Sequence, residues 1–88
     1  MDEIEILMQS AVASLLSIAE TNVRLRRLEW HLAHPGQRPT SEDMEAQIDA
    51  AYAAVSANFL PANPMWAAIE ERRLARRREI ARQFGSKI

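Results

Sequence analysis

Two proline-containing breaks divide the chain into three uninterrupted segments, and this division constrains the fold more than any other feature. The first break is His34–Pro39, where Pro35 disfavours helix at the preceding residue and Gly36 favours a turn. The second break is Leu60–Pro64. The segments between them are rich in Ala, Leu, Ile, Glu and Arg, which have high helix propensity. The sequence therefore predicts an all-α fold with three helices.

We expect one helical domain over residues 1–88, with helices at about 2–33, 41–59 and 64–84. Thr40 is a good N-cap for the second helix, and Asn63 followed by Pro64 is a strong start for the third. Gly85 is the matching stop signal. The short connections favour neighbouring helices that run antiparallel, so the pattern predicts a three-helix antiparallel bundle with a long first helix.

The three predicted helices differ in length. At about 1.5 Å per residue the first would be about 48 Å long, against about 28 and 32 Å for the others. One end of the first helix would then remain uncovered in a monomer, and exposed apolar side chains there are typical of an interaction surface. We therefore expect the bundle to be oligomeric.

The apolar residues of the first segment form a stripe that is wide for a single helix. Its main line is spaced by three and four residues: Ile4, Leu7, Met8, Ala11, Leu15, Ile18, Asn22, Leu25 and Leu32. A flank widens it: Val12, Leu16, Ala19, Val23 and Trp30. A stripe of this width predicts contact with two neighbours. Asn22 in the stripe either fixes the register of an oligomer or meets a polar group within the monomer, and the sequence leaves both interpretations open.

The third segment carries six of the ten arginines of the chain. On a helix, Trp66, Ile69, Ile80 and Phe84 fall on one side, with Arg73 and Arg77 in the middle of that side. Two interpretations compete for these arginines. They pair with carboxylates at a helix–helix contact, with Glu29 as the first choice, or they contact nucleic-acid phosphates.

The order of charges along the chain favours the pairing interpretation. Net charges of −4, +3, −4 and +4 follow one another over residues 1–22, 23–38, 39–63 and 64–88. This alternation suits helices that fold back so that opposite charges face each other. The residues that we expect at a protein interface are Asn22, Glu29, Trp66, Arg73, Arg77, Ile80 and Phe84.

The sequence contains no pattern typical of catalysis or of cofactor binding. It has no cysteine, no Gly-x-Ser-x-Gly elbow and no glycine-rich phosphate loop. His31 and His34 lie close enough to share a metal but lack further ligands, and a position near a helix C-terminus, where positive charge is favourable, is the better explanation. We expect no catalytic residue, no metal site and no cofactor.

The N-terminus is acidic, unlike a secretory signal, and the apolar run Ala11–Ala19 is far shorter than a membrane span. We therefore expect no membrane insertion and a location in the cytoplasm or in a large intracellular assembly. The predicted function is a non-enzymatic helical adaptor or structural subunit that mediates assembly with its own copies or with other proteins. The Ala- and Arg-rich composition suggests a virion or a bacterial multi-protein machine. The alternative is a small nucleic-acid-binding or regulatory protein that uses the third helix.

Overall fold

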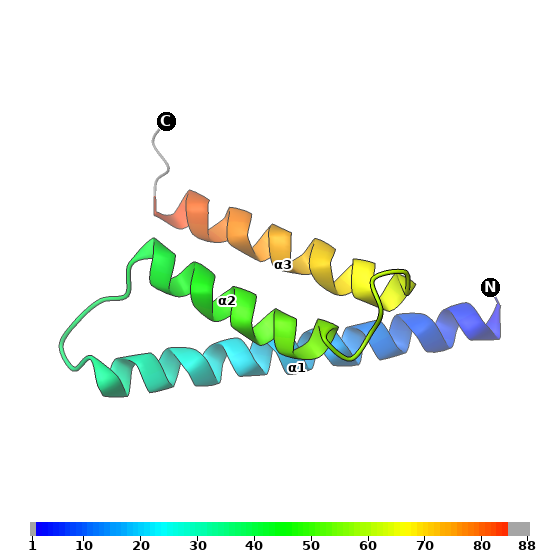
Figure 1. Cartoon of the computed structure of the whole chain (residues 1–88), viewed down its shortest axis with the longest axis horizontal. Helices are drawn as coiled ribbons and strands as arrows, with labels where there is room; N and C mark the ends of the chain where they lie inside the picture. Colours follow the sequence, from blue (N-terminus) through cyan, green and yellow to red (C-terminus); the bar gives the residue numbers. More distant parts are fainter. Residues whose placement is uncertain (1, 85–88) are drawn as a thin grey trace.

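The computed structural model describes residues 2–84 and contains three α-helices, with no strand in that range. Helix α1 spans Glu3–Ala33, α2 spans Ser41–Ser56 and α3 spans Pro64–Gln83. Helix α2 lies beside the C-terminal half of α1, and α3 lies beside α2 (Figure 1). The predicted all-α fold of three packed helices is confirmed. Gly85, the expected stop signal, lies outside the described residues.

Local capping explains where the helices begin. Asp2 accepts a hydrogen bond from the backbone N–H of Ile4, and the acidic first turn of α1 suits the positive end of the helix dipole. Thr40 and Asp43 form a reciprocal capping box, whose hydrogen bonds to the Asp43 carboxylate hold its pKa below the usual value. Asn63 accepts from the backbone N–H of Met65 at 2.8 Å, directly before Pro64.

Helix α2 ends at Ser56, whereas the sequence predicts an end near residue 59. Beyond Ser56 the backbone N–H groups of Asn58 and Phe59 donate to carbonyls three residues back, so the last turn tightens. The Asn58 amide also donates to the carbonyls of Ala54 and Val55, at 3.4 and 3.1 Å. These bonds satisfy the terminal carbonyls of α2 and stop the helix early.

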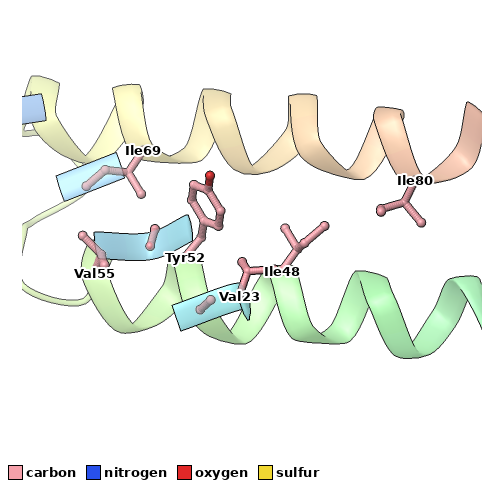
Figure 2. Close-up of a cluster of buried hydrophobic side chains, with 8 residues drawn as sticks. Val23, Ile48, Tyr52, Val55, Ile69 and Ile80 are labelled. Carbon is pink, nitrogen blue, oxygen red and sulfur yellow. The ribbon is translucent and has the colours of Figure 1, made fainter. Parts of the chain in front are cut away.

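The core lies where the middle of α1 meets α2 and α3. Figure 2 shows Tyr52 directed from α2 towards α3, among the side chains of Val23, Ile48 and Ile69. The buried core consists of eight residues: Ala19, Val23, Ile48, Ala51, Tyr52, Val55, Ile69 and Ile80. Leu15, Leu16, Met44 and Phe59 pack around it. Helix α2 supplies four of these eight buried residues and is therefore the central element of the bundle.

The buried side of α1 is the flank of its apolar stripe, and most of the main line is exposed. Ala19 and Val23, both on the flank, are its only fully buried residues in the described chain. Ile4, Leu7, Ile18, Leu25 and Leu32 on the main line are all exposed. Helical spacing identifies an apolar side but does not say which part of a wide one meets the other two helices.

The N-terminal end of α1 extends past the helices that pack on it (Figure 1). Every described residue from Asp2 to Ala11 is exposed. The molecule measures 50 × 32 × 21 Å, and its radius of gyration is 15.0 Å. A compact domain of this length would have a radius of gyration of about 12 Å. The expected uncovered end of the long first helix is confirmed.

Candidate interaction surface

One carboxylate connects all three helices. Glu20 of α1 accepts a hydrogen bond from the hydroxyl of Tyr52 on α2 and, at 2.9 Å, from Nε of Arg76 on α3. Arg76 also donates to Glu79 at 2.6 Å. Because Tyr52 is fully buried and the other two side chains are mostly covered, these polar groups depend on one another for hydrogen bonds.

The surroundings of Tyr52 and Arg76 shift the protonation equilibria of both side chains. Burial raises the pKa of Tyr52 to about 12, and the hydrogen bond to Glu20 and its negative charge act in the same direction. Burial disfavours the charged form of Arg76, but its contacts with Glu79 and Glu20 outweigh this and raise its pKa. The site is thus built to hold a neutral tyrosine, a carboxylate and a guanidinium together.

A second ionic cluster joins α2 to α3. The Asp49 carboxylate accepts from Arg73 at 2.8 Å and from Arg77 at 2.9 Å. Arg77 also contacts Glu45 at 3.0 Å. The hydrogen bonds that Arg73 donates to Glu70 and Asp49 raise the pKa of Arg73. The expectation that Arg73 and Arg77 meet carboxylates at a helix–helix contact is confirmed.

Glu29 was the predicted first partner of these arginines, but it does not contact either of them. Its side chain is exposed on α1, where it lines a groove together with Arg26 and Trp30. The prediction was wrong because α2 packs against α3 and carries Glu45 and Asp49, which contact Arg73 and Arg77. Spacing on α1 identified an acidic residue in an apolar stripe but did not identify the neighbouring helix.

The remaining predicted interface residues are distributed over the molecule. Ile80 is buried in the core, Trp66 is half-buried, and Phe84 remains 46% exposed at the end of α3. Asn22 is half-buried on α1. The structure therefore does not gather these residues into one surface, and the role of Asn22 in register stays a prediction. Sequence reasoning missed Glu20, although it is the only acidic residue between Glu5 and Glu29.

Most of the exposed large hydrophobic side chains in the described residues belong to α1, and most of those lie along its outer side. We call this side the α1 apolar face, and it consists of Ile4, Leu7, Ala11, Ile18, Leu25, Leu28 and Leu32. Its large side chains are exposed by 52% at Ile18 to 74% at Leu32. Isolated exposed leucines are common, but apolar side chains that recur along one side from Ile4 to Leu32 are typical of an interaction surface.

Two open grooves lie on the sides of α1. One, of about 390 Å³, separates its C-terminal half from α2 and includes Arg26, Glu29, Trp30 and Gln47 in its lining. The other, of about 400 Å³, lies between Met8, Val12 and Leu16 of α1 and the start of α3. Among the described residues, two buried side-chain nitrogen atoms lack a hydrogen-bond partner, Nε2 of Gln47 and Nη2 of Arg27. Both grooves are mostly apolar and shallow.

Helix α1 is long and apolar enough, by length and composition alone, to cross a membrane. The run Ala11–Ala19 is only the most apolar part of this helix, so the expectation drawn from its length alone was too narrow. No group of three His, Asp or Glu side chains in residues 2–84 is placed to hold a metal ion. The chain matches no protein-family model, no curated protein and no solved structure.

Tyr52 is the only tyrosine of the chain, so its ionisation can be followed by tyrosinate absorbance. In the native protein we expect the midpoint at about pH 12, against the ordinary value of 10.0 in urea. Because folding raises this pKa, its contribution to stability is complete below pH 10.0 and is lost as the pH rises towards 12. The Tyr52→Phe variant has no hydroxyl to ionise, so its free energy of unfolding should not show this loss as the pH rises. A midpoint near pH 10.0 for tyrosinate formation in the native protein would contradict the buried, Glu20-bound position of Tyr52.

The two ionic assignments for α3 can be compared by substitution. Asp49→Asn removes one partner from both Arg73 and Arg77, and we expect a loss of about 1 kcal/mol in the free energy of unfolding, since each partly exposed pair contributes at most about 1 kcal/mol. Glu29→Gln, the matched control, should change it by less than about 0.5 kcal/mol. Urea unfolding measures both. An equal or larger loss for Glu29→Gln would reverse the assignment.

Proposed function

We propose that this chain is a non-enzymatic helical subunit that mediates protein–protein assembly through the α1 apolar face. The protein acts as an adaptor or structural component of an oligomer or larger complex, and its helices form an antiparallel bundle. Its partners are further copies of the chain or other protein subunits. A cytoplasmic location, or one inside a large assembly such as a virion, belongs to the same proposal.

The exposed α1 apolar face is the observation that carries this proposal. A chain of 10.0 kDa would have an accessible surface of about 5,200 Å² as a compact monomer. The accessible surface is 6157 Å², roughly 900 Å² more. A standard protein–protein interface covers about 800 Å² on each partner. The additional surface is therefore of the size that one partner would cover.

The arrangement of α3 supports protein assembly over nucleic-acid binding. Arg73, Arg76 and Arg77 are held by carboxylates of the same chain, which neutralises the centre of the basic helix. The remaining arginines of α3, Arg72, Arg78 and Arg82, are exposed. They lie on a helix that also carries Glu71 and Glu79, so the outer side of α3 lacks the uniform positive charge that phosphate binding requires.

A triple variant tests the proposal. Leu7→Gln, Ile18→Gln and Leu25→Gln replace exposed side chains only, so helix content and the unfolding transition should be retained. Native mass spectrometry of the protein isolated from its source should give a complex with protein partners for the natural chain. The triple variant should give a monomer. The matched control carries Ile6→Gln, Ala13→Gln and His31→Gln, all exposed on other sides of α1, and should assemble like the natural chain.

Two results would overturn the proposal. A natural chain that is isolated as a free monomer would remove the need for an interface. DNA or RNA binding that falls steeply between about 50 and 200 mM salt and depends on Arg72, Arg78 and Arg82 would instead establish the nucleic-acid function. The proposal requires neither behaviour.

A further inference from the structure

We propose that the α1 apolar face is covered by α1 of a second copy of this chain, which runs in the opposite direction. This inference rests on the proposed assembly function and names the partner. The two 31-residue helices would form one long antiparallel pair, with α2 and α3 of each copy on the outside. The spacing of the exposed residues, the distribution of charge on α1 and the register that joins them lead to this partner.

The exposed side of α1 follows a seven-residue repeat. Ile4, Ala11, Ile18, Leu25 and Leu32 lie seven residues apart, and Leu7, Ser14, Thr21 and Leu28 follow the first four of them by three residues. All nine positions are exposed. We call this row the α1 seam. Sustained spacing of three and four residues in a heptad is the pattern by which one helix packs along another, whereas a helix facing a globular surface has no need of it.

The polar positions of the α1 seam are compatible with burial against a helix. The Thr21 hydroxyl donates to the carbonyl of Ser17 at 3.0 Å, so its hydrogen bond is already made within α1. Ala11, Ser14 and Thr21 are small and lie in the middle of the seam. Small residues there allow two helices to approach closely, while the leucines and isoleucines near both ends supply apolar contact area.

The charges of α1 specify the direction of the second helix. Glu3 and Glu5, together with the N-cap Asp2, give one end a charge of −3, and residues 24–31 give the other end +2. Within the described residues none of these charges takes part in an ion pair. The acidic residues of α2 are matched with α3, and Glu20 is held by Arg76. Both ends of α1 therefore remain uncompensated in a single copy.

An antiparallel pair compensates both ends at once. The acidic end of each helix would lie beside the basic end of the other, and the two helix dipoles would oppose each other. A parallel pair would place −3 beside −3 and +2 beside +2, within a Debye length of about 8 Å at physiological salt. Of the two directions that the seam permits, only the antiparallel one is electrostatically favourable.

One register brings the large apolar side chains of the two seams together. When Leu7 lies opposite Leu25 of the second copy, Ile4 lies opposite Leu28 of that copy, because the two helices run in opposite directions. The two-fold axis would then pass near residue 16, and Ile4, Leu7, Leu25 and Leu28 of one copy would meet Leu28, Leu25, Leu7 and Ile4 of the other.

A membrane is a poorer occupant of this face. The first 23 residues carry no basic side chain, so the acidic end of α1 gains nothing from anionic lipid headgroups. Glu20, in the middle of the helix, is bound to Tyr52 and Arg76. Insertion of α1 across a bilayer would have to break these contacts and separate α1 from the rest of the core.

The absence of cysteine from the chain allows a direct test by cross-linking of single-cysteine variants. A mixture of Leu7→Cys and Leu25→Cys should form a disulfide-linked heterodimer rapidly under mild oxidation, and Leu7→Cys alone should not. A parallel pair would give the reverse result. Ile6→Cys mixed with Arg26→Cys, two exposed positions of α1 outside the seam that the same register places at one level, is the matched control and should cross-link at least about tenfold more slowly.

Charge reversal tests the electrostatic argument independently. Arg24→Glu with Arg26→Glu should weaken dimerisation by about tenfold or more in sedimentation equilibrium, and so should Glu3→Lys with Glu5→Lys, since each places like charges together. A mixture of the two double variants should recover the natural affinity as a heterodimer. Recovery would not follow if these residues only stabilised the monomer.

The outcomes separate this inference from the proposed function. The purified natural chain should sediment as a dimer of about 20 kDa, twice the mass of one chain. A purified monomer whose native complex contains other proteins, lost in the Leu7, Ile18 and Leu25 triple variant, would overturn the second copy but leave the assembly function intact. A monomer that instead binds lipid vesicles through α1 would assign the face to a membrane. A monomer in every setting would overturn both.

Discussion

The position of α1 depends on the contact among Glu20, Tyr52 and Arg76. Helix α1 contributes only Ala19 and Val23 as fully buried residues, so apolar burial alone gives it a weak hold on the other two helices. The Glu20 carboxylate accepts hydrogen bonds from the Tyr52 hydroxyl and the Arg76 guanidinium, and these directional contacts fix the position of α1 on the other two helices. Removal of one partner would leave the others without hydrogen bonds in a poorly solvated site, which costs more than the intact contact gains.

This contact divides the charged groups of the molecule into two sets. Around it, α2 and α3 neutralise each other through Asp49, Glu45 and the arginines Arg73 and Arg77. Farther out, both ends of α1 retain their charges and the apolar side chains between them. Charged groups are therefore paired where the three helices meet, whereas unpaired charges and exposed apolar side chains remain along the outer side of α1. The proposed assembly function rests on that asymmetry.

Local signals in the sequence predicted most of the fold. Proline, glycine and capping residues located the three helices, and the excess length of the first helix predicted its uncovered end. The pairing of Arg73 and Arg77 with carboxylates also followed from their place in an apolar stripe. The choice of Glu29 and the choice of the buried side of α1 failed for one reason. Helical periodicity places residues on a side of a helix, but the neighbour of that side depends on the packing of all three helices, which no single segment encodes.

The exposed first turns of α1 connect folding to concentration. From Asp2 to Ala11 no side chain is buried, so this stretch is helical only through its propensity, its N-cap and its continuity with the anchored middle. Such a segment opens at a small free-energy cost and would exchange its amide hydrogens much faster than the core. In the proposed assembly, the free energy of partner binding would have to offset the entropy that this segment loses when it becomes ordered. The helix available for contact would then be longer. In the proposed assembly, the length of stable helix in α1 would therefore depend on how much partner is present.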